Sequence, residues 1–121
     1  MTRPVTVGLI GLGEVAQLMH LPLLADDPRF AIAAITDVSP SLVDHIATRY
    51  GVPTRHADAA ALMADPALDA VFILTPDHLH ADLLDRAICA GKHVFIEKPA
   101  CLTADQLRPI LDIPQRDGQV V

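Results

Sequence analysis

The opening stretch, residues 5–16, constrains most strongly what this chain can fold into. It reads V-T-V-G-L-I-G-L-G-E-V-A, an apolar run followed by Gly11, Gly13 and Ala16 in the spacing G-x-G-x-x-A. The run predicts a buried strand, Gly11 a sharp turn, and Ala16 a helix that packs closely on the sheet. Because Gly13 has no side chain, a pyrophosphate could approach the free N–H groups at the helix start. A bare glycine turn is the alternative, but the flanking strand and helix signals favour a dinucleotide site.

Composition agrees with a single α/β domain over residues 1–121. Hydrophobic residues make up 51% of the chain and aromatic residues only 3%, an aliphatic composition that suits a parallel sheet covered on both faces. The net charge of −6 and the lack of a basic cluster disfavour binding to nucleic acid or to an anionic membrane. No apolar run reaches the roughly 18 residues of a membrane span. Cys89 and Cys101 form no Cys-x-x-Cys motif, so we expect reduced thiols in a cytoplasmic protein.

Strand and helix signals alternate along the chain. Strands are predicted at residues 5–10, 30–35, 53–56, 69–75 and 92–97, and helices at 15–25, 40–50, 59–64, 78–90 and 104–111. The predicted N-caps are Ser39, Asp58, Asp77 and Thr103. Pro22 should kink or split the first helix, and residues 119–121 are typical of a sixth strand cut short. The alternation predicts a doubly wound, mostly parallel Rossmann-type sheet.

Asp37 is the candidate that decides between two dinucleotides. It lies 26 residues beyond Gly11 and just past the second predicted strand. Its carboxylate would accept hydrogen bonds from the adenosine ribose, and its charge would repel a 2′-phosphate, which favours NAD over NADP. The alternative is an acid that serves only in a turn or cap, although Ser39 already fills the cap position.

Two further segments should meet at the carboxyl edge of the sheet. Thr75-Pro76-Asp77 ends the fourth predicted strand and Glu97-Lys98-Pro99 ends the fifth, where open α/β sheets bind ligands. Lys98 could exchange a proton with a substrate or bind its oxygen, and Glu97 could orient it. A surface salt bridge before a turn is an equally good interpretation.

The histidines that follow Asp77 do not predict a metal site. His78 and His80 would face different directions on a helix, and no third ligand is evident. We therefore expect no metal. His80 is better interpreted as a neighbour of the cofactor or substrate, with a solvated helix histidine as the alternative.

Three motifs together resemble a known family. They are G-L-G-E-V-A at residues 11–16, T-P-D-H-L-H at 75–80 and, most specific, A-G-K-H-V-F-I-E-K-P at 90–99. In these motifs the chain is similar, over essentially its whole length, to the amino-terminal domain of the Gfo/Idh/MocA oxidoreductases, the glucose–fructose oxidoreductase and inositol dehydrogenase family. Asp77 departs from the asparagine common in that family.

The resemblance implies an NAD(P)-binding Rossmann domain and hydride transfer between a nicotinamide and a hydroxyl-bearing carbon of a sugar, inositol or related polyol. It makes Lys98 a catalytic residue at the nicotinamide, with a peptide bond to Pro99 that is often cis. The cofactor-binding positions that it implies are Gly11, Gly13, Glu14 and Val15 at the pyrophosphate, Asp37 at the ribose, and Thr75, Pro76, His80, Glu97 and Lys98 at the nicotinamide half.

Members of the family continue into a second α/β domain that shapes the substrate pocket, supplies an aspartate and a histidine for proton transfer, and often mediates oligomerisation. We expect residues 1–121 to lack that domain, to bind NAD without turnover, and to form a homo-oligomer through the poorly covered fifth strand. A non-catalytic dinucleotide-binding or interaction module is the alternative. A methyltransferase fits less well, because it leaves Glu97-Lys98-Pro99 unexplained.

Overall fold

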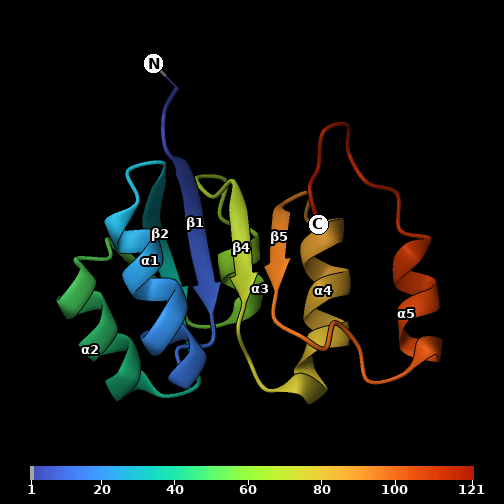
Figure 1. Cartoon of the computed structure of the whole chain (residues 1–121), viewed down its shortest axis with the longest axis horizontal. Coiled ribbons are helices and arrows are strands. Elements are labelled where there is room, and N and C mark those ends of the chain that lie inside the picture. The colour runs from blue at the N-terminus through green and yellow to red at the C-terminus, as the bar shows by residue number, and fades with distance from the viewer. Residues whose placement is uncertain (1) are drawn as a thin grey trace.

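The computed structural model describes residues 2–121, and its central feature is a five-stranded parallel sheet (Figure 1). The strand order is β3-β2-β1-β4-β5. The chain adds β2 and β3 on one side of β1 and then crosses to add β4 and β5 on the other side, so the order of the strands reverses at β1. Leu9 of β1 lies opposite Ile35 of β2 and Phe72 of β4. The strands are β1 (Val5–Ile10), β2 (Phe30–Thr36), β3 (Thr54–Arg55), β4 (Ala70–Ile73) and β5 (His93–Ile96). The predicted doubly wound parallel sheet is confirmed, although β4 is shorter at both ends than the predicted strand.

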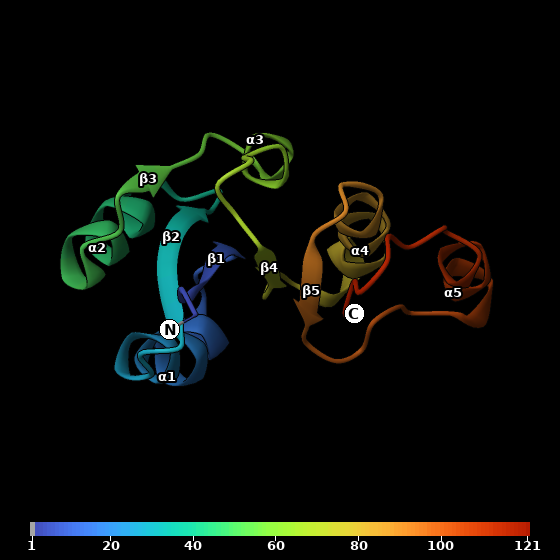
Figure 2. The same cartoon turned by 90° about the horizontal axis from the view of Figure 1, so that it is seen from above.

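Helices cover both faces of this sheet (Figure 2). One face packs on α1 (Leu21–Asp26) and α2 (Pro40–Tyr50), and the other packs on α3 (Ala59–Met63) and α4 (His80–Cys89). The last helix, α5 (Ala104–Leu111), lies beside α4 and adds Ile110 to the second core. Both cores are almost entirely aliphatic, as the composition predicts. Within residues 2–121, no helix has the length and apolarity that crossing a membrane requires.

The first helix is split, as Pro22 predicts. A π-helical turn, η1 (Ala16–His20), precedes α1, and the Leu21 N–H donates across it to the Ala16 carbonyl. Pro22 is the second residue of α1, directly after η1, and supplies no N–H to the helical hydrogen bonds at this point. The chain stays helical from η1 into α1, but the wider π turn changes the direction in which the η1 side chains point compared with a regular α-helix.

Three of the four predicted caps are confirmed. Ser39, Asp58 and Thr103 each accept a hydrogen bond from the N–H three residues later. Asp77 is not a cap, and that prediction was wrong. Pro76 is extended, so the chain turns into the 3₁₀ segment η2 (Asp77–Leu79) at Asp77 itself, and α4 begins without a side-chain cap.

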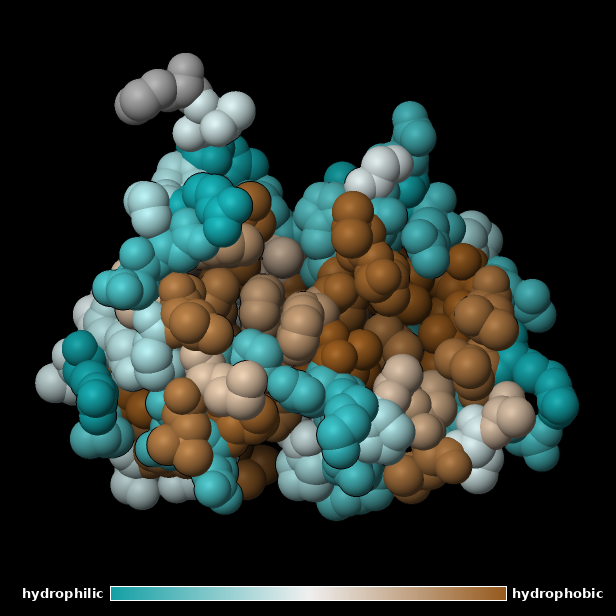
Figure 3. All heavy atoms as spheres, viewed as in Figure 1, coloured by the Kyte–Doolittle hydropathy of each residue, from teal (hydrophilic) through white to brown (hydrophobic). Residues whose placement is uncertain are grey.

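The predicted sixth strand does not form. In the last five residues the backbone of Val120 is the part that bonds to β5: its carbonyl accepts the Val94 N–H at 2.9 Å and its N–H donates to His93 Nδ1 at 3.0 Å. The side chain of Gln119, not its backbone, bonds to the Lys92 carbonyl at 2.7 Å, which leaves too few ladder bonds for a strand. The outer edge of β5 is therefore mostly unpaired, and apolar side chains gather over this part of the molecule (Figure 3). Phe95 of β5 is 42% exposed.

Candidate functional site

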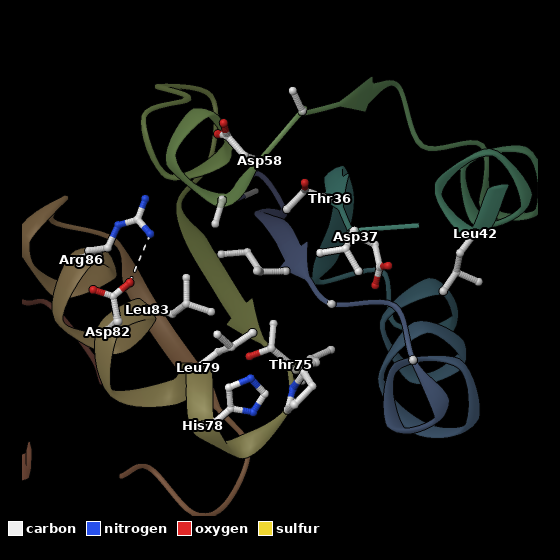
Figure 4. Close-up of a pocket in the computed structure, with 18 of the residues that line it drawn as sticks. Thr36, Asp37, Leu42, Asp58, Thr75, His78, Leu79, Asp82, Leu83 and Arg86 are labelled. Carbon is white, nitrogen blue, oxygen red and sulfur yellow. Dashed lines mark hydrogen bonds and ion pairs between the residues drawn. The ribbon is translucent and has the colours of Figure 1, made fainter. Parts of the chain in front are cut away.

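A cavity of about 780 Å³ opens at the carboxyl ends of β1, β2 and β4 (Figure 4). This is the sheet edge, beside the reversal in strand order, where ligands bind in open α/β folds. The volume lies within the roughly 300–1,000 Å³ typical of small-molecule sites. Predicted site residues in its lining are Gly11, Gly13, Glu14, Asp37, Thr75 and Pro76.

The two glycines of the opening motif have different structural roles at this cavity. Gly11 has a φ of +94°, and a Cβ there would lie 2.9 Å from the backbone of Leu74 and Thr75. Only glycine fits, because the turn needs a positive φ and the β1 loop presses on the β4 loop. Gly13 has no positive φ, and a Cβ there would meet nothing within 4 Å. Position 13 therefore faces open space in the cavity, which is the room a pyrophosphate needs.

The helix that follows Gly13 begins with unpaired donors. Its first intrahelical bond runs from the Gln17 N–H to the Gly13 carbonyl at 3.0 Å. The amides of Gly13, Glu14 and Val15 come before that bond, and the first N–H groups of a helix have no intrahelical partner. They carry the positive end of the helix dipole, which favours an anion. No cationic side chain is needed for this part of the site.

Asp37 holds the glycine loop in place. Its Oδ2 accepts the Leu12 N–H at 2.7 Å, and its Oδ1 accepts the Ser39 N–H at 2.9 Å. The carboxylate therefore fixes the loop to the end of β2, a role that spacing alone did not indicate. Each oxygen keeps a lone pair for a ligand hydroxyl, because an ionised carboxylate offers about four acceptor positions.

The rest of the lining carries acidic side chains on more than one side of the cavity. Asp37 and Asp82 lie on opposite sides of the cavity in Figure 4, and Asp82 pairs with Arg86 at 3.3 Å. Asp58, the α3 cap, also lines the cavity. The sequence did not indicate Asp82 or Arg86, because nothing local to an exposed helical ion pair shows that it faces a ligand site.

Thr75 presents an unused polar group. Its Oγ1 is buried and has no hydrogen-bond partner among the described residues, although Thr75 lines the cavity. A buried hydroxyl without a partner costs free energy, so such a group commonly awaits a ligand or a water. With the open position at Gly13, it fits a ligand that supplies both phosphate and hydrogen-bonding groups.

Beyond the cavity lining, the carboxyl end of β5 carries the second predicted segment. Lys98 is exposed, and its peptide bond to Pro99 is cis, as the family resemblance implied. Glu97 forms its ion pair with His20 of η1, with 2.6 Å between Nε2 and Oε1. The hydrogen bond from His20 lowers the pKa of Glu97 below its ordinary value. The prediction that Glu97 could orient Lys98 stays a prediction; the side-chain partner of the Glu97 carboxylate in the structure is His20.

His80 is fully buried, so the solvated-histidine alternative was wrong. Its Nδ1 lies 2.6 Å from the Pro99 carbonyl and its Nε2 lies 2.9 Å from the Thr75 carbonyl. The ring thus connects the loop after β4 to the turn after β5. Like Val15, Glu97 and Lys98, His80 is not in the cavity lining.

Among residues 2–121, no three His, Cys, Asp or Glu side chains are grouped to hold a metal.

The arrangement provides an anion site at a helix start, acceptors for ribose hydroxyls, and a lysine beside a carboxylate–imidazole pair. Residues 5–121 match the model of the Gfo/Idh/MocA family, described as an oxidoreductase family with an NAD-binding Rossmann fold. Inositol 2-dehydrogenase of Rhizobium meliloti (strain 1021) is 37% identical over 109 residues, which cover 90% of this chain and 32% of that protein.

Solved structures agree. A 3-ketoreductase from Actinomadura kijaniata in complex with NADP and TDP-benzene superposes with a TM-score of 0.83 at 32% identity, covering 89% of this chain and 33% of that chain. Apo scyllo-inositol dehydrogenase from Lactobacillus casei gives 0.85 at 28% identity, covering 92% and 33%. The chain spans about a third of the length of these relatives. With residues 5–121 matched throughout, the chain belongs to the Gfo/Idh/MocA oxidoreductase family and corresponds to its NAD(P)-binding Rossmann domain.

Proposed function

We propose that residues 1–121 are the cofactor-binding domain of a dehydrogenase that transfers hydride between NAD and a hydroxyl-bearing carbon of a sugar, inositol or related polyol. The observation that carries this proposal is the open position at Gly13 beside the unpaired amides of Gly13, Glu14 and Val15, just before η1. Relatives named as an inositol dehydrogenase and a 3-ketoreductase support the substrate class. The bound nicotinamide would supply the hydride chemistry.

The protein's own part in that chemistry is binding and proton transfer. The amides of Gly13, Glu14 and Val15 would bind the pyrophosphate, and the free Thr75 hydroxyl would bond to the cofactor. Val15, His80 and Glu97 would act as further cofactor neighbours, although they are outside the cavity lining. Lys98 would hold or transfer the proton of the substrate hydroxyl at Nζ. For residues 1–121 themselves the proposed activity is binding of NAD, since the chain spans about a third of the length of its relatives.

NAD is the cofactor that the cavity fits best. Asp37 cannot easily turn away from a 2′-phosphate, because both of its oxygens are held by amides. A phosphate beside this fixed carboxylate would meet like-charge repulsion. Arg86 is the only lysine or arginine among the lining residues, and it lies on the far side of the cavity, paired with Asp82. The Actinomadura relative binds NADP, so the family does not decide this point.

A calorimetric titration of the chain with NAD and NADP tests the proposal. Gly13→Leu is the most informative variant, because position 13 has no positive φ and the new side chain would enter only the open space of the cavity. We expect NAD affinity to fall at least tenfold while the melting temperature stays within a few degrees. Thr48→Leu, on the exposed side of α2, is the matched control. Wild-type chain that binds neither dinucleotide, or Gly13→Leu that binds as wild type does, would contradict the proposal.

We also propose that copies of the chain associate through the edge of β5. On the outer edge of β5, Val120 forms a backbone hydrogen bond with Val94 only, and the exposed Phe95 lies on the same strand. Sedimentation should show a dimer or larger species, and Phe95→Lys should weaken this association. The two unpaired cysteines are a separate matter, and they fit a reducing compartment such as the cytoplasm. A monomer at millimolar concentration would overturn the association.

A further inference from the structure

Lys98 lies between two residues that histidines hold from opposite sides. Glu97 is bound through its carboxylate by His20 of η1, at 2.6 Å. Pro99 is bound through its carbonyl by His80 of α4, at 2.6 Å. The turn that presents Lys98 is therefore attached to two separate helices. His80 is fully buried and belongs to the core, whereas the ring of His20 bonds to the side chain of Glu97 and so offers a testable link.

The position of His20 depends on the π-helical turn. His20 is the last residue of η1, and the wide turn is closed by the Leu21 N–H bonding to the Ala16 carbonyl. Short π turns occur often at functional sites, because one extra residue redirects a side chain without ending the helix. The same helix starts with the amides that face the cavity. His20 therefore connects the anion-binding helix to the Lys98 turn.

The imidazole of His20 is held firmly. Its ring meets Phe72 and Phe95 edge-on, with centroid distances of 5.8 and 5.0 Å, and its side chain is only 11% exposed. The two phenylalanine rings stack on each other at 5.0 Å. Nε2 is thus fixed toward Glu97 by packing on β4 and β5, at little cost in side-chain freedom on forming the bond.

Without His20, the Glu97 carboxylate would lose the one side-chain hydrogen bond that the described residues give it. A half-buried carboxylate that has lost this partner would turn out to water, because a partly desolvated charge without a partner is unfavourable. Glu97 directly precedes Lys98, so a change in Glu97 moves the start of the lysine side chain. The Glu97 N–H, bonded to the Ile73 carbonyl at 3.2 Å, would then be the remaining tie to β4.

We propose that His20 is a positioning residue for Lys98, acting through the carboxylate of Glu97. The inference rests on the proposed function in one respect only, namely that Lys98 serves the reaction. The geometry of the His20–Glu97–Lys98 connection stands independently of which cofactor binds.

The lysine content of the chain makes a clean experiment available. There are two lysines, Lys92 and Lys98, so chain labelled with ¹³C-lysine gives two Cε–Hε cross-peaks by NMR. Lys92 lies at the opposite end of β5, buried, with Nζ donating to the carbonyls of Asp65 and Leu68 at 2.7 and 2.8 Å. Its peak reports whether each variant keeps the fold. Lys98→Arg assigns the other peak.

His20→Leu is the main variant, and spectra are recorded free and at saturating NAD. We expect the Lys98 peak to move toward the position of an unstructured lysine and its response to NAD to fall by at least half, with the Lys92 peak unmoved. His20→Gln keeps an N–H donor for Glu97 and should restore most of the wild-type response, which a loss of packing alone would not explain. His45→Leu, on the exposed side of α2, is the control and should change neither peak.

The positioning role is overturned if the Lys98 peak has the same position in wild type and in His20→Leu, both without NAD and at saturating NAD. If His20→Leu also moves the Lys92 peak, Glu97→Ala replaces it, and it must reproduce the Lys98 shift or the proposal fails. Wild-type chain that shows no response to NAD counts against the proposed function, while the free spectra still decide the positioning role.

Discussion

The carboxylate of Asp37 accepts the Leu12 N–H at 2.7 Å and thereby fixes the shape of the glycine loop from the neighbouring strand. One side chain thus connects the glycine loop to the end of β2, the two parts of the proposed dinucleotide site. Under that proposal loop geometry and cofactor choice depend on the same residue, so substitutions there should change both.

Asp37→Ala should lower the free energy of unfolding by about 1–3 kcal/mol, because the Leu12 and Ser39 amides lose their acceptor. It should also reduce any preference for NAD over NADP at least tenfold, since the repelling charge is gone. Urea unfolding and calorimetric titration with each dinucleotide measure the two effects. An unchanged preference would show that the carboxylate does not meet the ribose.

Thr75→Val should separate ligand binding from folding. The substitution removes a buried hydroxyl that has no partner among the described residues, so the free energy of unfolding should stay level or rise by up to about 1 kcal/mol. NAD affinity should fall roughly three- to tenfold, the net value of one hydrogen bond. Thr54→Val on β3 is the control. Full affinity in Thr75→Val would mean that a water, not the cofactor, uses the hydroxyl.

His80→Leu should be among the most destabilising substitutions in the chain. The ring is fully buried between the carbonyls of Thr75 and Pro99, so its loss leaves at least one of them without a donor. We expect a loss of about 2–4 kcal/mol in the free energy of unfolding, measured by urea denaturation. His45→Leu serves as the control. A loss below 1 kcal/mol would contradict the role of the ring in joining the two loops.

Acid should destabilise the chain partly through Asp69. A bidentate hydrogen bond from Arg3, and then bonds from the Thr6 N–H and hydroxyl, hold the pKa of Asp69 well below its ordinary value of 3.8. A lowered folded-state pKa adds stability above the ordinary pKa, and that stability is lost as the pH falls through the folded value.

Asp69→Asn should therefore destabilise the chain at pH 6 and flatten the dependence of unfolding free energy on pH below 4. Asp105→Asn, in an exposed pair with Arg108, should leave the dependence close to that of wild type. Equal slopes for wild type and Asp69→Asn would contradict the assignment.

Local signals predicted most of the fold. Glycines, caps and alternating apolar runs are properties of a few neighbouring residues, so the strands and the Ser39, Asp58 and Thr103 caps could be placed from sequence. Asp77 failed because the conformation of Pro76, not the capping preference of aspartate, decides where the turn begins. The predicted sixth strand failed because the Gln119 side chain bonds where a backbone group was expected.

The site was predictable where its residues lie in a motif, and not where they meet across the fold. Gly11, Gly13 and Asp37 were found from spacing and do line the cavity. His20 could not be paired with Glu97, because 77 residues separate them and an unpredicted π turn brings them together. The burial of His80 had the same origin, since its two acceptors come from two different strand ends.

The π turn of η1 also means that the two ends of the first helix can be adjusted separately. Leu18 and Met19 are exposed within it, so removing one of them would cost little packing. Such a deletion would restore regular α-helical geometry and rotate the residues before the turn by about 100° relative to those after it. The presence of one residue in η1 thus sets the rotation between the amides at the helix start and the imidazole of His20, which reaches Glu97 at the end of β5. A natural variant one residue shorter at this point would change that rotation without changing either group.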